Sequence, residues 1–353
     1  MTAEALPTTT RAAVLTGLNQ PLEILELELP PLKPGQLLVE VAYSGVCHSQ
    51  LNEARGRKGA DPYIPHAMGH EGAGRVLAVG EGVTKVGVGD AVILTWIKGQ
   101  GADVPSTVYG SALGPVNSGA IATFMERCIT CENRVVPLPE GLPLREAALL
   151  GCAVPTGGGV VMNSGAVTGG KSVAVFGVGG IGSAAVAVAA ALGAAPLIAV
   201  DVVPEKLETA RRFGASHTID ARSEDVPARI REIAGGSGVD LAVEAAGVPK
   251  VMEQAFASVR TGGGLCVLAG NVTAGETIRL DPYDLIKGRR LVGTWGGETQ
   301  PDRDLPLYAR MAGEGKLDLT AMIGRVYGLD EINQALDDLE SGRVLRPIIA
   351  FRS

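Results

Sequence analysis

The stretch that decides the fold is 172–182, with the sequence SVAVFGVGGIG. Its first half, Ser172 to Phe176, has the apolar character of a strand that is buried on both faces. The GxGxxG pattern of Gly177, Gly179 and Gly182 follows, and an uncharged, Ala-rich run then predicts a helix packed closely on the sheet. This pattern is a weak signal alone, but between a strand and a helix it predicts a turn that binds a dinucleotide pyrophosphate.

The residues after the glycine turn extend this pattern. The apolar run 197–201 predicts the next strand and ends at Asp201, about twenty residues beyond the last glycine. A carboxylate there accepts hydrogen bonds from the adenosine ribose and repels a 2′-phosphate, which favours NAD over NADP. Strands and helices then alternate to about residue 293. They predict an α/β domain with a six-stranded, doubly wound parallel sheet.

The segment before about residue 153 has a different pattern. Its short β-type runs, such as 37–41 and 89–94, are bounded by Gly and Pro and predict a β-rich domain. The chain after about residue 295 offers two helical stretches and an apolar run at 347–351. This tail is too short for a third core, so it is expected to return to the first domain. The predicted domains are therefore 1–153 with 295–353, and 154–294.

Composition and charge narrow the class of protein. Hydrophobic residues make up 46% and charged residues 20%, which is typical of a globular protein. A formal net charge of −7 without a basic run argues against nucleic acid or an anionic membrane, so the expected partner is a small molecule. Residues 172–200 are uncharged and long enough to cross a bilayer, but glycines interrupt them. The N-terminus lacks a secretory pattern and the five cysteines fit a reducing compartment, so the cytoplasm is the expected location.

Three residues far apart in the sequence form a candidate metal site. They are Cys47 in GVCHS, His70 in GHEGAG and Cys152 in GCA. Two thiolates and one imidazole can hold a catalytic zinc with one position open, although each residue alone is also common in a protein core. Glu71 is placed to sit behind the metal and modulate its field. A metal and a dinucleotide site on one chain indicate hydride transfer at an alcohol carbon.

The order of these motifs resembles that of a known family. Further matching pieces are Val88 to Val92, Thr156 with Gly157, and Ser341 to Arg343. The sequence resembles the zinc-dependent medium-chain alcohol dehydrogenases over nearly its whole length. The resemblance implies a GroES-like catalytic domain and a Rossmann domain inserted before the C-terminal tail. It also implies NAD-linked interconversion of a primary or secondary alcohol with its aldehyde or ketone, and one catalytic zinc per chain.

The resemblance assigns roles to single residues. Cys47, His70 and Cys152 would bind the zinc, which acts as a Lewis acid on the alcohol. Ser49 would take the alcohol proton, or alternatively cap the helix after Cys47. Trp96 would line the substrate pocket, and Trp295 would pack at the domain junction. The resemblance also assigns Glu71 and His48 to catalysis. His48 and Arg346 would contact the cofactor pyrophosphate. The other residues assigned to cofactor binding are Thr156, Gly177, Gly179, Gly180, Ile181, Gly182, Asp201 and Lys206.

Three departures from the family pattern affect these expectations. No cysteine lies between Cys47 and Cys128, so we expect no four-cysteine structural zinc and a reorganised loop at 97–119. The Cys128 and Cys131 pair cannot complete a tetrahedral site and is interpreted as packing. Gln50 stands where relatives commonly carry an acid. Asn52 replaces a histidine of the proton relay, so proton release would use His48, water or another route.

Three other functions stay open at this point. One is a zinc-free reductase of the same superfamily that acts on quinones or enones. The second is an NAD-using, redox-neutral epimerase or lyase, and the third is a binding protein without turnover. Metal content tests the first alternative. Net cofactor consumption tests the second, and detection of any turnover tests the third.

A homo-oligomer, either a dimer or a tetramer, is also expected. The run 264–278 resembles the segment through which relatives pair their sheets edge to edge.

Overall fold

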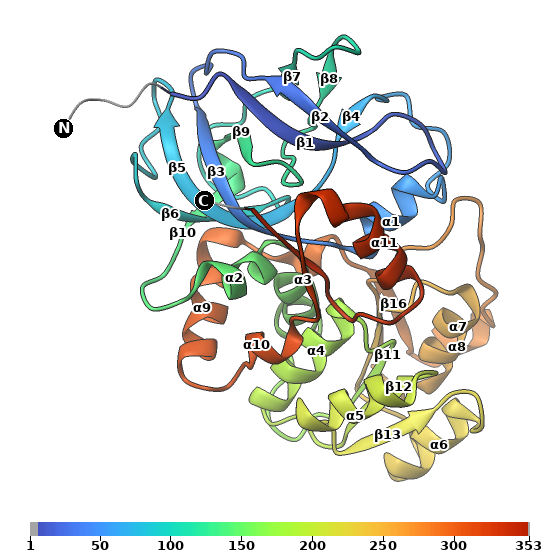
Figure 1. Cartoon of the computed structure of the whole chain (residues 1–353). Coiled ribbons are helices and arrows are strands. Elements are labelled where there is room, and N and C mark those ends of the chain that lie inside the picture. Colours follow the sequence, from blue (N-terminus) through green and yellow to red (C-terminus); the bar gives the residue numbers. More distant parts are fainter. Residues whose placement is uncertain (1–5, 352–353) are drawn as a thin grey trace. The chain divides into compact units, whose positions relative to one another are not determined.

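The computed structural model describes residues 6–351, and these form two compact units (Figure 1). The first unit extends to Cys152 and includes Gln300–Arg310 and the chain from Leu319 onward. The second unit comprises Ala153–Thr299 and Met311–Asp318. The predicted domains had their second boundary at residue 295, whereas the structure has it at 299/300. The short segment 311–318, predicted in the first domain, groups with the second unit.

The first unit is built on two sheets. One has five strands in the order β2-β1-β4-β8-β7, and the other has seven strands in the order β10-β6-β5-β3-β18-β17 with β9 also paired to β3. The strands are β1 Thr9–Leu15, β2 Glu23–Glu28, β3 Gln36–Gly45, β4 His66–Ala67, β5 Glu71–Val79, β6 Ala91–Thr95, β7 Val108–Tyr109, β8 Val116–Asn117, β9 Arg127–Cys131, β10 Val135–Pro137, β17 Val326–Tyr327 and β18 Ile348–Ala350.

Short helices connect these strands. The α-helices of the first unit are α1 His48–Ala54, α2 Leu144–Ala147, α10 Leu319–Met322 and α11 Ile332–Glu340, and α9 spans Pro301–Gly313. The 3₁₀ helices are η1 Glu132–Arg134, η2 Ala148–Gly151 and η5 Leu329–Glu331.

The C-terminal tail returns to the first unit, as predicted. Strand β18 pairs antiparallel with β3, so that Ile348 lies opposite Gly45. Helix α11 is amphipathic and places Ile332, Leu336 and Leu339 in a core cluster with Val46 and Leu51. Strand β18 therefore lies beside the segment that leads to Cys47.

The loop predicted to be reorganised contains a small antiparallel pair. Strands β7 and β8 pair with each other, and β8 joins β4 in parallel through His66 and Asn117. Tyr109 of β7 is buried, and its hydroxyl oxygen accepts a hydrogen bond from Ile129 N–H at 2.8 Å. This contact ties the loop to the core of the first unit.

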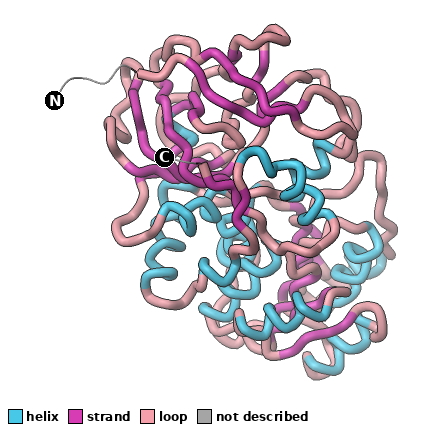
Figure 2. Tube along the Cα trace, viewed as in Figure 1, coloured by secondary structure: helices cyan, strands magenta, loops and turns pink. Residues whose placement is uncertain are grey.

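The second unit is a doubly wound parallel sheet (Figure 2). Its order is β13-β12-β11-β14-β15-β16, and every pair is parallel, which confirms the predicted α/β class and six-stranded sheet. Its strands are β11 Val173–Phe176, β12 Leu197–Asp201, β13 His217–Asp220, β14 Leu241–Glu244, β15 Leu265–Leu268 and β16 Arg290–Gly293. Its helices are α3 Ala153–Gly159, α4 Gly180–Ala191, α5 Pro204–Arg212, α6 Val226–Ile233, α7 Pro249–Ser258 and α8 Pro282–Ile286, with the π-helix η3 Val160–Ser164 and the 3₁₀ helix η4 Gly296–Glu298.

Local sequence explains most of these elements. All four residues of β11 are buried, as expected for a central parallel strand. Helices α5, α6 and α7 each have proline in the first turn, where a missing N–H costs nothing. Asp225 caps α6 by accepting a hydrogen bond from Ala228 N at 3.1 Å.

The run 264–278, through which copies of the chain were predicted to pair, is only partly a strand, and that pairing stays a prediction. Strand β15, which opens the run 264–278, has β14 on one side and β16 on the other, so it is an interior strand. The edges of this sheet are β13 and β16.

The uncharged stretch 172–200 divides into β11, the glycine turn, α4 and β12, as predicted. Within residues 6–351, no single helix is both long and apolar enough to cross a membrane. Two consecutive segments with a bend between them, Leu144–Gly151 and Ala153–Ser164, together reach that length and composition.

Candidate active site

The three predicted metal ligands come from three separate connections of the first unit. Cys47 lies directly before α1, His70 lies between β4 and β5, and Cys152 ends η2. Pairing of β3 with β5 places Ser44 opposite Gly72, which brings the first two connections together. Thr95 of β6 donates its hydroxyl to Gly151 O at 2.8 Å and fixes the third.

Gly69 permits the chain to approach closely before His70. It has a φ of +95°, and a Cβ there would lie 2.4 Å from Phe124 N. No other residue type avoids both the strain and the clash. The glycine of the GHE motif is therefore a requirement of the local packing.

The ligand atoms converge. One atom each from Cys47, His70, Glu71 and Cys152 lies within 4.8 Å of every other, and His70 Nε2 lies 3.3 Å from Cys152 Sγ. The two cysteines and Glu71 are buried, and His70 is partly buried. The structure thus brings together all three predicted ligands and adds the Glu71 carboxylate to their group.

The thiols of Cys47 and Cys152 have pKa values that are shifted in opposite directions. The pKa of Cys47 lies well below its ordinary value because the Cys152 thiol hydrogen-bonds to its sulfur, while His70 and the positive charge of Arg346 act in the same direction. The pKa of Cys152 lies well above its ordinary value because that hydrogen bond holds its proton and burial disfavours a second thiolate. The first thiolate is therefore available for a cation, and the second forms when a cation replaces the shared proton.

Glu71 and Arg346 form a buried ion pair behind the sulfurs. Glu71 is fully buried, Arg346 is 4% exposed, and an Arg346 Nη2 donates to Glu71 Oε1. Burial raises the pKa of Glu71, and the guanidinium opposes that rise. The other oxygen, Oε2, is buried and has no hydrogen-bond partner among the described residues.

These donors suit zinc. Two sulfurs, one imidazole nitrogen and a carboxylate oxygen form a group of acceptors that a divalent cation would satisfy. Cys47, His70 and Cys152 are the residues that would hold the ion, with Glu71 behind them. The pairing of Glu71 with Arg346 was not predicted, since 275 residues separate them. A possible signal was the position of Arg346 just before the last apolar run.

Helix α1 carries the other predicted catalytic residues. Cys47 is its N-cap, and Gln50 accepts a hydrogen bond from Cys47 N at 2.9 Å, so Gln50 rather than Ser49 closes this helix end. Ser49 lies in the first turn, half-buried, and His48 is exposed. Asn52 accepts a hydrogen bond from Arg57 Nη1 at 3.3 Å. Gln50 thus has a structural role that an acid at the same position would also perform through its carboxylate.

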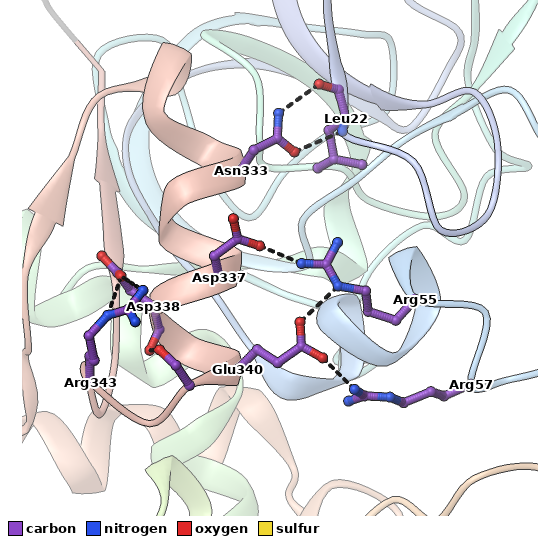
Figure 3. Close-up of polar contacts among 9 residues, drawn as sticks. Leu22, Arg55, Arg57, Asn333, Asp337, Asp338, Glu340 and Arg343 are labelled. Atoms are coloured by element: carbon purple, nitrogen blue, oxygen red, sulfur yellow. Dashed lines mark hydrogen bonds and ion pairs between the residues drawn. The ribbon is translucent and has the colours of Figure 1, made fainter.

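The C-terminal helix holds α1 in place through long-range polar contacts (Figure 3). Arg55, directly after α1, donates to Asp337 at 2.5 Å and to Glu340 at 2.8 Å, and Arg57 also contacts Glu340. Asn333 exchanges two hydrogen bonds with the backbone of Leu22, at 2.8 and 2.9 Å. These contacts join α11 to two segments of the first unit.

A cavity of about 420 Å³ lies beside His70. Residues of α1, of the loop before β4 and of the β7–β8 region surround it. Trp96 is not among the lining residues; its ring contacts His70 in a T-shaped arrangement, with the ring centroids 6.3 Å apart. The lining residues are Gln50, Glu53, Asp61, Tyr63, His66, Ala67, Met68, Gly69, His70, Ser106, Asn117, Ser118, Gly119 and Ile121.

The Cys128 and Cys131 pair lies in strand β9. Both thiols are buried, and burial raises the pKa of Cys128 to about 12. The Cys131 thiol donates to Asn133 Oδ1 at 3.0 Å. Neither residue belongs to the potential metal groups found among residues 6–351.

In the second unit, the glycine turn is shaped by close backbone contacts. Gly177 has a φ of +84°, and a Cβ on Gly182 would lie 1.9 Å from Gly177 O. A Cβ on Gly179 would meet nothing within 4 Å, so this part of the turn is open. Gly180 and Ile181 form the first turn of α4, whose free N–H groups can bind phosphate.

Asp201 ends β12 beside that turn. Its Oδ2 accepts a hydrogen bond from Val178 N at 2.7 Å, and its Oδ1 accepts from Val202 N and Val203 N at 2.8 and 3.0 Å. The carboxylate is thus fixed at the end of the strand. Sequence reasoning assigned Asp201 only to the ribose and missed this structural role.

Two further predicted cofactor residues lie in the second unit. Thr156 of α3 is 5% exposed, and its hydroxyl has no partner among the described residues. The next residue, Gly157, packs against α4, because a Cβ there would lie 2.1 Å from Ile181 O. Lys206 is partly exposed in the first turn of α5. The open turn, the helix start and the orphaned hydroxyl fit a dinucleotide.

Comparisons with known proteins agree with this architecture. Residues 33–140 match the model of the alcohol dehydrogenase GroES-like domain, and residues 180–311 match that of the zinc-binding dehydrogenases. The S-(hydroxymethyl)glutathione dehydrogenases of Photobacterium damsela subsp. piscicida and Synechocystis are each 34% identical to the chain over 97% of its length and 99% of theirs.

Solved structures give the same result. An alcohol dehydrogenase zinc-binding domain protein from Burkholderia ambifaria is 32% identical, with a TM-score of 0.90 over 98% of this chain and 99% of that one. Benzyl alcohol dehydrogenase from Acinetobacter calcoaceticus is 29% identical, with a TM-score of 0.89 over 98% of this chain and all of that one. With the converging ligands in one unit and the glycine turn in the other, these likenesses establish that the chain belongs to the zinc-binding medium-chain alcohol dehydrogenase family.

Proposed function

We propose that this dehydrogenase is an NAD-linked, zinc-dependent enzyme that interconverts a primary or secondary alcohol with its aldehyde or ketone. The observation that carries the proposal is the convergence of Cys47, His70 and Cys152 on one point, with a carboxylate oxygen of Glu71 beside them. A zinc-free reductase would have no use for two buried thiols and an imidazole so arranged. Asp201, fixed at the end of β12, supports NAD over NADP because it repels a 2′-phosphate.

Different residues of the chain are assigned to metal binding, to the charge behind the metal and to proton transfer. When bound, zinc supplies Lewis acidity that lowers the pKa of an alcohol, and NAD supplies the hydride acceptor. Cys47, His70 and Cys152 would hold the metal, and the Glu71–Arg346 pair would set the charge behind it. The Ser49 hydroxyl would accept the alcohol proton while it passes its own proton on. Asn52 does not titrate and is held by Arg57, so the proton leaves through water or through His48.

The substrate class follows from the relatives and from the cavity beside His70. S-(hydroxymethyl)glutathione and benzyl alcohol, named for two relatives, are the first compounds to compare, together with short aliphatic alcohols and polyols. An aromatic ring beside a metal ligand suits aryl or allylic alcohols as well as small aliphatic ones, and the Trp96 ring centroid lies 6.3 Å from that of His70. We also propose a cytoplasmic homo-oligomer.

Elemental analysis and NADH formation with this alcohol panel test the proposal. We expect about one zinc per chain in the cysteine site and NAD reduction. Cys47→Ala should lose that zinc and at least about 10³-fold in kcat/KM, because several kcal/mol of Lewis-acid stabilisation are removed. Cys131→Ala, which removes a buried thiol outside the group, is the matched control and should retain both.

Other results would point to other functions. Activity of Cys47→Ala without metal would refute the zinc mechanism. Absence of zinc together with reduction of quinones or enones would assign the chain to the zinc-free reductases. Product formation without net NADH would indicate a redox-neutral epimerase or lyase.

A further inference from the structure

A second group of metal-ligating side chains surrounds the loop between α1 and β4. Glu53 lies in α1, Asp61 lies in the loop and His66 is the first residue of β4. One side-chain atom from each lies within 4.8 Å of the other two. None of the three belongs to the Cys47, His70 and Cys152 group, and all three line the cavity beside His70.

The imidazole of His66 is oriented by the backbone. Its Nδ1 lies 3.2 Å from Ala67 O, and its Nε2 lies 2.9 Å from Asp61 Oδ2 and 3.4 Å from Glu53 Oε1. Because Nδ1 faces a carbonyl, Nδ1 carries a hydrogen, and Nε2 turns toward two carboxylates. A carbonyl that holds the distal ring N–H is the usual partner of a metal-binding histidine. The His66 side chain is only 12% exposed.

The fold also directs the two carboxylates. Asp61 Oδ1 accepts a hydrogen bond from Tyr63 N at 2.8 Å, which leaves Oδ2 toward the imidazole. Lys58 Nζ lies 2.9 Å from Glu53 Oε2, which leaves Oε1 toward the imidazole. One proton on Nε2 points to one oxygen at a time, whereas a divalent cation contacts both oxygens and the nitrogen.

We propose that Glu53, Asp61 and His66 form a second divalent-cation site, one that takes a zinc-class transition-metal ion. Two carboxylates balance the charge of such an ion, and one nitrogen with two oxygens is a ligand set that zinc accepts. The adjoining cavity leaves room for water at the remaining coordination positions. This inference does not depend on the proposed function. The competing possibility is an ion-pair network in which a proton on His66 takes the place of the metal.

Calorimetric titration with ZnCl₂ separates these possibilities. The protein is used as purified, after its resident metal has been counted. We expect the wild type to bind about one more zinc per chain than His66→Leu, and Asp61→Asn to bind that zinc at least about tenfold more weakly. His217→Gln removes an exposed imidazole from the second unit and should match the wild type. A wild type that binds no added zinc, or a His66→Leu variant that binds as much with equal affinity, would overturn the proposal.

A second measurement uses only the wild type, in case a variant does not fold. Crystals soaked in ZnCl₂ are examined by anomalous scattering at the zinc edge. A peak within coordination distance of His66 Nε2 and of at least one of the two carboxylates is the expected result. A peak at the Cys47, His70 and Cys152 group alone would refute the site.

Discussion

The candidate metal site of the first unit is formed by residues from four distant parts of the chain, whereas the glycine turn of the second unit lies between two consecutive strands. Cys47, His70 with Glu71 and Arg346 meet because β3 pairs with both β5 and β18, and the hydrogen bond from Thr95 to Gly151 fixes Cys152 beside them. The turn needs only β11, α4 and the end of β12. The first site depends on buried charged groups that compensate one another. The second depends on glycines, because their lack of side chains permits close backbone contacts. The difference predicts that the two sites fail in different ways.

The largest effect should come from leaving a charge unpaired in the first unit. Arg346→Met leaves Glu71 buried without its partner, which should lower the free energy of unfolding by about 3–5 kcal/mol. Denaturant unfolding measures this change. The control is Arg343→Met. The Arg343 side chain pairs with Asp338 but is 64% exposed, so its removal should lower the free energy of unfolding far less.

A double variant sharpens the same test. Glu71→Gln combined with Arg346→Met removes both charges and should recover part of the lost stability. Equal losses for the single and double variants would show that the pair contributes packing rather than charge compensation.

A smaller effect is expected at the glycine turn. In Gly182→Ala the new methyl group meets Gly177 O, so the turn must open at a cost of about 1–3 kcal/mol. NAD affinity, measured by fluorescence titration, should fall, while the zinc content of the first unit stays unchanged. Gly179→Ala, placed where a Cβ meets nothing within 4 Å, is the matched control for the clash. Loss of zinc in Gly182→Ala would contradict the independence of the two sites.

The smallest effect should come from the ion pairs between α11 and α1. Arg55 donates a hydrogen bond to Glu340 and holds the pKa of that carboxyl below its ordinary value. The Tyr327 hydroxyl and Arg343 do the same for the pKa of Asp338. A lowered folded-state pKa gives stability that is present above about pH 4 and is lost as the pH falls through the folded value.

Thermal unfolding from pH 7 to pH 3 measures this dependence. Partly exposed pairs contribute only about 0.2–1 kcal/mol, so Glu340→Gln should lower Tm slightly at pH 7 and flatten its decline in acid. An unchanged acid profile in Glu340→Gln would show that other carboxyls control the decline.

The two units also differ in how much of their structure could be predicted from the sequence. The sheet of the second unit, its turn and Asp201 follow from contiguous patterns, because strand, turn and helix are neighbours in the chain. The metal ligands were predicted from their residue types and then from the family resemblance, because no fixed spacing links them. The Glu71–Arg346 pair was missed because it depends on strand pairing, and the Glu53, Asp61 and His66 group was missed because the path of the loop between α1 and β4 determines it. Trp295 was predicted to pack, yet it is 80% exposed, because residue type alone does not determine which face of the chain is covered.

The return of β18 to β3 has a consequence for synthesis of the protein. Arg346 is synthesised after Cys47, His70, Glu71 and Cys152. Until Arg346 and β18 have been synthesised, the Glu71 carboxylate lacks its guanidinium partner, and β3 lacks one neighbouring strand. A chain terminated before Arg346 therefore cannot complete the charge balance behind its thiols.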